Sequence, residues 1–265
     1  MKWLTGILLL LLVSPALAAE RILALTPAAC EMMYAIGAGD ELVGAGEYCD
    51  FPAAAKALPR VANYRQLYVE AALRQKPTLV IALSAALPGL DALKASGVRV
   101  FTSNPLSVAD VMADMLHLGE LSGHRRQAAT AVAAMRKRLQ ALQKSSAKTK
   151  PRVFYEIWHE PLIAAGGGSL INSVLGDMGL QNVFADIPLE GPKVSVEAVL
   201  LAKPDIIMFA GDGHVQARKR FWRKWFKEKA ICFVETSADL LHRPGPRLVQ
   251  GMQALHAALK AKSCE

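Results

Sequence analysis

Five side chains in this sequence could contact a bound ligand, and each follows a stretch that we expect to form a β-strand. They are Tyr48, Tyr64, His159, Asp239 and Arg243. Open α/β sheets bind ligands at the carboxyl ends of their strands, so these residues should gather at one edge. Aromatic rings stack on planar ligands, and a few polar groups fix the ligand's orientation. The residue types therefore favour a binding cleft.

Catalytic chemistry has weaker support. Gly167-Gly168-Ser169 lacks the G-x-S-x-G spacing of a nucleophile elbow, and no H-E-x-x-H motif occurs. One enzymatic hypothesis stays open, a periplasmic metal-dependent hydrolase that uses His159, Asp212 and His214. We expect no catalytic residue, no metal site and no intrinsic cofactor.

The chain contains four cysteines, an even number that is compatible with disulfides in an exported protein. Four cysteines allow three pairings, which the sequence does not distinguish. The most local arrangement joins Cys30 to Cys49 and Cys232 to Cys264. Zinc is a poor alternative because no C-x-x-C pair is present.

Residues 1–18 have the features of a secretory signal. Lys2 supplies a positive charge, Leu4 to Val13 form an apolar run, and Ala16-Leu17-Ala18 is a small-x-small cleavage site. We therefore expect a periplasmic, soluble and monomeric mature protein.

The formal net charge is +8, and much of it lies in RKRFWRKWFKEK, residues 218–229. Such a cluster can bind nucleic acid or a membrane surface. The segment also fits an amphipathic helix with Phe221, Trp222, Trp225 and Phe226 toward the core. An exported protein meets little nucleic acid, so we favour the helix, with solvated basic side chains and no nucleic-acid partner.

Short apolar runs alternate with helical segments, which indicates βαβ units and parallel sheets. Between two such regions, residues 124–143 contain no Gly or Pro and predict one long helix. We therefore expect an N-terminal α/β lobe over 19–122, a linking helix over 123–146 and a C-terminal α/β lobe over 147–265. Strands are expected at 21–25, 42–43, 79–83, 98–102, 153–157, 206–209 and 231–234.

The two halves share an internal repeat. VEAALRQKP begins at Val69 and VEAVLLAKP begins at Val196, and a buried strand is predicted after each. Each copy places a glutamate, Glu70 or Glu197, in the first turn of a short helix. The helix dipole favours a carboxylate there, but this does not explain why each lobe exposes one at an equivalent place.

Together these features resemble the solute-binding proteins of ABC importers whose lobes are joined by a rigid helix, a family that serves vitamin B12, haem and ferric siderophores. The resemblance spans essentially the whole chain after residue 18. It rests on Thr26-Pro27, the Tyr48-x-Asp50-Phe51-Pro52 segment, the two repeats and Arg243-Pro244-Gly245-Pro246-Arg247.

The resemblance implies two Rossmann-like lobes around one cleft and a transported ligand, cobalamin or a related corrinoid, delivered to a permease dimer with its ATPase. Glu70 and Glu197 would meet arginines of the permease. Leu83, Ile163 and Gly191 stand where the cobalamin-binding relative has large aromatic side chains. The expected ligand contacts are Ala28, Ala29, Tyr48, Tyr64, Arg65, His159, Ile163, Asp239 and Arg243.

A haem- or ferric-siderophore-binding protein of the same family is the alternative. Haem-binding members place an iron-ligating Tyr where this sequence has Asn63, one position before Tyr64. If the ligand were haem, His159 would be the candidate second iron ligand.

Overall fold

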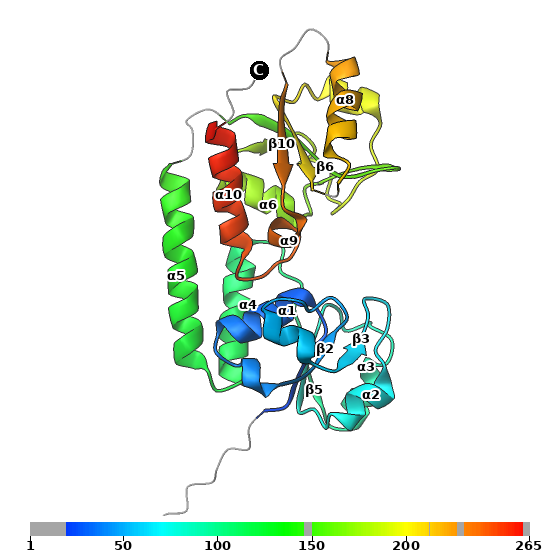
Figure 1. The fold of residues 1–265 in the computed structure, drawn as a ribbon, viewed down its shortest axis with the longest axis vertical. Coiled ribbons are helices and arrows are strands. Elements are labelled where there is room, and N and C mark those ends of the chain that lie inside the picture. Colours follow the sequence, from blue (N-terminus) through cyan, green and yellow to red (C-terminus); the bar gives the residue numbers. More distant parts are fainter. Residues whose placement is uncertain (1–19, 146–149, 212, 227–230, 262–265) are drawn as a thin grey trace, which may run out of the picture.

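The computed structural model describes residues 20–145, 150–211, 213–226 and 231–261. The chain forms two α/β lobes, one above the other in Figure 1, with a long helix beside both. The predicted signal segment 1–18, Asp212 and Cys264 lie outside the described residues. None of the helices in the described part has the length and apolarity that a bilayer span requires.

The N-terminal lobe is built on a five-stranded parallel sheet with the order β3-β2-β1-β4-β5. Strands β1 and β4 are buried along their whole length because helices cover both faces of the sheet. The predicted strands at 21–25, 79–83 and 98–102 are confirmed to within one residue at each end. The strands are β1 (Ile22–Ala24), β2 (Leu42–Gly46), β3 (Arg60–Ala62), β4 (Leu79–Ala82) and β5 (Arg99–Thr102).

Helix α1 begins at Thr26, whose Oγ1 accepts a hydrogen bond of 3.1 Å from the Ala29 N–H, while Pro27 occupies the first turn. Its buried face packs on one side of the sheet together with α4, and α2 and α3 cover the other side. The helices of this lobe are α1 (Pro27–Ala35), η1 (Gly39–Glu41), η2 (Ala53–Ala57), α2 (Val69–Arg74), α3 (Leu90–Ala95) and α4 (Val108–Leu121).

The C-terminal lobe has a second sheet, with the order β10-β9-β6-β7 and β8 beside the start of β6. Strand β7 runs antiparallel to β6, so this sheet is mixed rather than wholly parallel as the sequence predicted. The reason is the short connection of two residues, Glu160 and Pro161, because parallel strands need a longer crossover. The strands are β6 (Arg152–His159), β7 (Leu162–Ala164), β8 (Gln181–Asn182), β9 (Ile206–Ala210) and β10 (Cys232–Thr236).

Helix α5 (Arg125–Lys144) is the predicted long helix, and its 20 residues correspond to a length of about 30 Å. It packs on α4 in the N-terminal lobe and on α10 in the C-terminal lobe. One cluster of buried apolar side chains continues along it from lobe to lobe. The other helices of the C-terminal lobe are α6 (Leu170–Asp177), α7 (Val196–Leu201), α8 (Val215–Trp225), α9 (Ala238–Leu241) and α10 (Leu248–Ala261).

The internal repeat has the same backbone in both lobes. Helices α2 and α7 each span six residues and are followed by a lysine with positive φ, Lys76 at 48° and Lys203 at 46°. Within the described part of the chain these are the two non-glycine residues with positive φ. Each lysine precedes a proline, which cannot continue the helix. The equivalence predicted from sequence therefore extends to a left-handed residue at the end of each helix.

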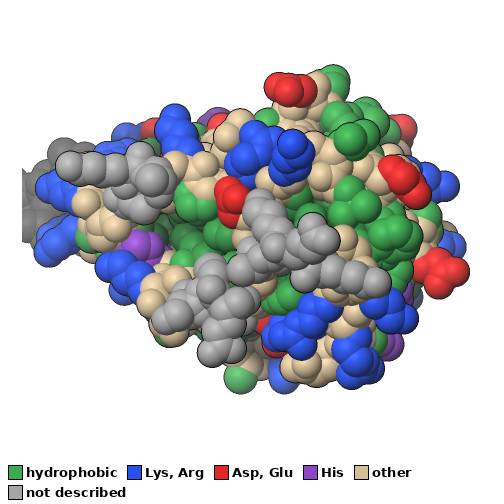
Figure 2. All heavy atoms as spheres, turned by 90° about the horizontal axis from the view of Figure 1, so that it is seen from above, with side chains coloured by type: hydrophobic (Ala, Val, Ile, Leu, Met, Phe, Trp, Pro, Cys, Tyr) green, Lys and Arg blue, Asp and Glu red, His purple; other side chains and the backbone are tan. Residues whose placement is uncertain are grey.

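Residues 218–225 of the basic segment lie in α8 as expected, and residues 227–229 lie outside the described residues. Two side chains of the helix differ from the prediction. Trp222 is buried, whereas Trp225 at the helix end is 49% exposed. Arg218 is not a solvated cation, because its Nε and Nη2 lie 2.5 and 2.9 Å from the buried Glu156 carboxylate. At this end of the molecule, Figure 2 shows Lys and Arg side chains in separate groups among apolar and acidic ones.

Candidate functional site

A pocket of about 470 Å³ lies at the carboxyl ends of the N-terminal strands and reaches the C-terminal lobe. The loops after β1 to β5 all contribute to it, which is the arrangement expected of an open α/β sheet. From the C-terminal lobe, the segment after α9 closes one side. The lining includes Thr26, Ala28, Tyr48, Tyr64, Arg65, Leu83, Ser103, His242, Arg243 and Pro244.

A second pocket, of about 380 Å³, adjoins the first from the side of the C-terminal lobe. Leu83, His242 and Pro244 line both pockets, so the two are halves of one cleft between the lobes. Ile163 and Gly191 both line this half. Their small volume leaves room for a ligand.

Tyr48 and Tyr64 are the aromatic residues of the first pocket. Their ring centroids are 6.4 Å apart, and the rings are tilted by 39°. They are 56% and 70% exposed, although aromatic rings of this size are usually more deeply buried. Arg65 places its guanidinium 5.5 Å from the Tyr64 ring centroid. Two exposed aromatic faces on neighbouring loops can receive a large planar ligand.

A tight turn held by Asn63 presents Tyr64. The side-chain oxygen Oδ1 of Asn63 accepts hydrogen bonds from the N–H groups of Arg65 and Gln66, at 2.8 and 2.9 Å. Its amide donates to the hydroxyl of Tyr68, 3.1 Å away, which in turn donates to Glu47. Asn63 therefore shapes the loop, and it lines the pocket together with Tyr64 and Arg65.

A disulfide between Cys30 of α1 and Cys49 holds the loop of Tyr48, and the Cα atoms are 6.1 Å apart. This confirms one of the two pairs in the most local arrangement. Cys232 is buried in β10, and its predicted partner Cys264 lies outside the described residues. Arg60 adds hydrogen bonds to the carbonyl oxygens of Gly46 and Cys49, both at 3.0 Å.

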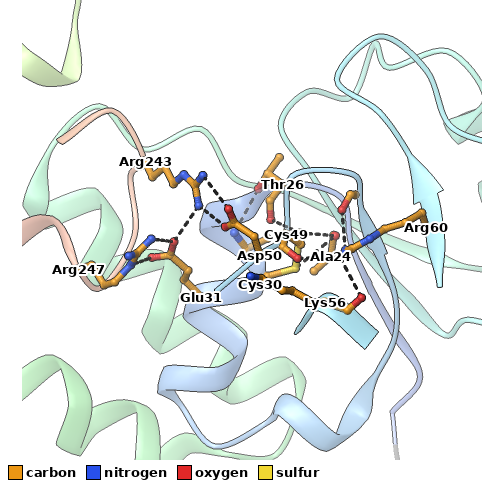
Figure 3. The surroundings of a disulfide bond; sticks show 12 residues. Ala24, Thr26, Cys30, Glu31, Cys49, Asp50, Lys56, Arg60, Arg243 and Arg247 are labelled. Carbon is orange, nitrogen blue, oxygen red and sulfur yellow. Dashed lines mark hydrogen bonds and ion pairs between the residues drawn. A yellow bond between two sulfur atoms is a disulfide. The ribbon is translucent and has the colours of Figure 1, made fainter. Parts of the chain in front are cut away.

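Two arginines of the C-terminal lobe meet two carboxylates of the N-terminal lobe beside this disulfide (Figure 3). Arg247 binds Glu31 with two hydrogen bonds, of 2.9 and 2.5 Å, and Glu31 is 2% exposed. Arg243 contacts Asp50 at 2.6 Å and lies 3.7 Å from Glu31. The hydrogen bond from Arg243 lowers the pKa of Asp50, and Glu31 raises the pKa of Arg247. We call these four residues the interlobe ion cluster.

The sequence did not single out Glu31 as functional, nor Asp50 as an ion-pair partner. Asp50 stands within the Tyr48-x-Asp50-Phe51-Pro52 segment, and each acid directly follows a cysteine of the disulfide. That adjacency was the available signal. Arg247, which the sequence marked only as part of the Arg243–Arg247 segment, binds the other lobe.

The structure does not bring all predicted ligand contacts together. Ala28, Tyr48, Tyr64, Arg65 and Arg243 line the first pocket, and Ile163 lines the second. Asp239 contacts Arg243 at 2.8 Å. Three predicted contacts, Ala29, His159 and Asp239, line neither of the two pockets. Ala29 is completely buried, and neither pocket is lined by His159, whose ring lies 5.2 Å from Trp158 and 5.3 Å from His214.

His242 was not predicted, yet it lines both pockets. Its Nε2 lies 2.8 Å from the hydroxyl of the buried Tyr155, and that hydroxyl lies 2.7 Å from Oγ1 of Thr236. Burial lowers the pKa of His242 and raises that of Tyr155, so both groups favour their neutral forms. The sequence offered little signal, because the partners are 81 and 87 residues apart.

Glu70 and Glu197 occupy equivalent exposed positions in the first turns of α2 and α7, one in each lobe. The α7 helix begins at Ser195, whose hydroxyl accepts a hydrogen bond from the Ala198 N–H. The backbone N–H of Glu197 itself and then the Ser195 hydroxyl lower the pKa of the Glu197 carboxyl. The carboxylate is thus held in its charged form on the surface.

The three residues proposed for metal-dependent hydrolysis are not all described by the structure. Within the described residues, no group of three or more His, Cys, Asp or Glu side chains could hold a metal ion. Asp212 lies outside those residues.

Residues 22–238 match the model of a family described as periplasmic binding protein. The chain belongs to the periplasmic binding protein family. The vitamin B12-binding protein of Photorhabdus laumondii is 34% identical over 239 residues, which cover 89% of this chain and 86% of that protein. The resemblance seen in the sequence is therefore confirmed.

Solved members of this periplasmic binding protein class have the same fold. The periplasmic vitamin B12 binding protein of Vibrio cholerae aligns over 92% of this chain and 97% of its own, with 33% identity and a TM-score of 0.81. A periplasmic haem-binding protein from Pseudomonas aeruginosa aligns over 93% and 94%, with 28% identity and a TM-score of 0.74. Both support the fold class predicted, two α/β lobes.

Proposed function

We propose that this protein is the periplasmic solute-binding component of an ABC importer and holds cobalamin or a related corrinoid between its lobes. The observation that supports this most directly is the two-part cleft, open at Tyr48 and Tyr64 and lined by loops from both lobes. The vitamin B12-binding relatives at 33–34% identity supply the ligand class. The protein has no catalytic role in this proposal.

The ligand would lie against Tyr48 and Tyr64 on one side and reach Ile163 on the other. Arg65 and Arg243 supply hydrogen-bond donors at the cleft edge, where the amide side chains of a corrinoid present carbonyl oxygens. Ala28 leaves space for the ring, and Asp239 orients Arg243.

Calorimetric titration with cyanocobalamin, cobinamide and haemin, side by side, tests the ligand. We expect binding of one corrinoid per protein and weaker or no binding of haemin. Failure of both corrinoids to bind would overturn the assignment.

Haem is the second candidate, because the structure resembles a haem-binding protein at 28% identity and exposes Tyr64 in the cleft. A phenolate ligand to iron gives a charge-transfer absorption band. Haemin that binds with such a band, combined with no corrinoid binding, would favour haem.

Delivery to the permease would use Glu70 and Glu197, which project from equivalent helices of the two lobes. We expect Glu70→Ala with Glu197→Ala to keep ligand affinity and abolish uptake into cells or vesicles that contain the transporter. Asp91→Ala is the matched control, since Asp91 is an exposed acid in the first turn of the six-residue helix α3. Normal uptake by the double variant would contradict docking through these residues.

A further inference from the structure

The two halves of the cleft meet at Leu83, His242 and Pro244. A planar macrocycle that occupies both halves would therefore have its centre near these residues. Of the chain's six histidines, all within the described residues, His242 is the one that lines these two pockets. Its position makes it the nitrogen base closest to where the metal of such a macrocycle would lie.

Hydrogen bonds beneath the cleft determine which ring nitrogen of His242 carries the proton. The Thr236 hydroxyl donates to the Phe209 carbonyl oxygen at 2.9 Å, so its single proton is used. The Tyr155 hydroxyl must then donate to Thr236 Oγ1, 2.7 Å away. Its oxygen is left as an acceptor, and His242 Nε2, 2.8 Å away, donates to it.

In a neutral imidazole with a proton on Nε2, Nδ1 has a free lone pair. No group among the described residues forms a hydrogen bond with Nδ1 of His242. Nε2 points into the buried interior toward Tyr155, and the two ring nitrogens point in nearly opposite directions. Nδ1 is thus directed away from Tyr155, on a ring that borders the cleft. Histidines that bind metals typically have this arrangement, with the second nitrogen donating to a fixed partner.

We propose that Nδ1 of His242 is an axial ligand to the metal of the transported macrocycle, the cobalt of a corrinoid that has an exchangeable axial water. The inference rests on the proposed function and deepens it. In the step, the bond between Co(III) and water breaks, a bond between cobalt and Nδ1 forms, and the water leaves. No electron or proton is transferred. Tyr155 is a positioning residue, because it acts on the ligand through His242.

Two forms of cobinamide test the proposal. Aquacobinamide has exchangeable axial water, whereas dicyanocobinamide has both axial positions blocked by cyanide. We expect aquacobinamide to change its visible absorption bands on binding to the protein, and His242→Gln to abolish that change and lower its affinity at least about tenfold. Affinity for dicyanocobinamide should stay within about twofold. His117→Gln, on the exposed face of α4, is the matched control and should behave as the unsubstituted protein.

Electron paramagnetic resonance on the unsubstituted protein gives a test that needs no variant. Cobalt(II) cobinamide coordinated by one ¹⁴N nucleus shows a three-line superhyperfine splitting, which becomes two lines when the protein histidines carry ¹⁵N. Absence of the splitting in bound cobinamide would overturn the proposal. If neither cobinamide nor cyanocobalamin binds, the proposed function itself fails, so the two failures are distinguishable.

Discussion

Arg243 of the C-terminal lobe and Asp50 of the N-terminal lobe meet across the cleft, with Nη1 and Oδ1 2.6 Å apart. Arg243 also lines the ligand pocket, so the same guanidinium joins the lobes and borders the site. Any ligand that interacts with the Arg243 guanidinium therefore also affects the contact between the lobes.

Asp50→Asn should reduce the dependence of the free energy of unfolding on pH in the acidic range. The hydrogen bond from Arg243 lowers the pKa of Asp50 in the folded state, so its stabilisation is present above about pH 4, the unfolded pKa, and is lost as pH falls through the folded pKa. Because Asp50 is half exposed, we expect this stabilisation to be no more than about 1 kcal/mol. Chemical denaturation between about pH 6 and 2.5 measures this difference. An identical pH dependence in both proteins would contradict the expectation.

Glu31→Gln should cost much more stability than a surface substitution. Glu31 is buried and neutralises Arg247, so its removal leaves an uncompensated arginine between the lobes. We expect the free energy of unfolding to fall by about 3 kcal/mol. Glu120→Gln, which affects an exposed pair with Arg125, should change it by less than about 0.5 kcal/mol. Equal changes in the free energy of unfolding for the two variants would show that the buried pair stabilises the fold no more than the exposed pair.

Removal of the disulfide should destabilise the interlobe ion cluster as well as the fold. Cys30→Ser with Cys49→Ser opens a link across 19 residues, for which we expect a loss of about 3 kcal/mol. Because Glu31 and Asp50 adjoin the two cysteines, corrinoid affinity should also fall, as calorimetry would detect. Reductant should lower the stability and the corrinoid affinity of the unsubstituted protein and leave both unchanged in the double variant. Undiminished corrinoid affinity in the double variant would show that the disulfide does not support the binding site.

Tyr48→Leu and Tyr64→Leu should each weaken corrinoid binding about fivefold, which corresponds to roughly 1 kcal/mol for a stacked ring. The rings are already exposed, so thermal stability should change little. Trp225→Leu removes an exposed aromatic residue outside the cleft and serves as the control. A similar loss of affinity in all three variants would point to a general effect rather than stacking.

The sequence predicted most of the alternating elements because buried parallel strands are continuous apolar runs such as Leu79–Ala82. It missed β3, β7 and β8, whose two or three residues are too short to show a period, and with β7 it missed the antiparallel pair. Tyr48 was predictable because its loop follows the strand expected from Leu42, whereas the strand before Tyr64 is β3. The interlobe ion cluster was not, since Arg243 and Asp50 are 193 residues apart and meet only once both lobes have folded.

Each lobe consists of one uninterrupted stretch of chain, before or after α5. A single recombination event within the segment for this helix would exchange a complete lobe, with its half of the cleft and its exposed glutamate, for that of a relative. Ligand preference can therefore diversify one lobe at a time in evolution, provided that the new pair keeps matching charges where the lobes meet.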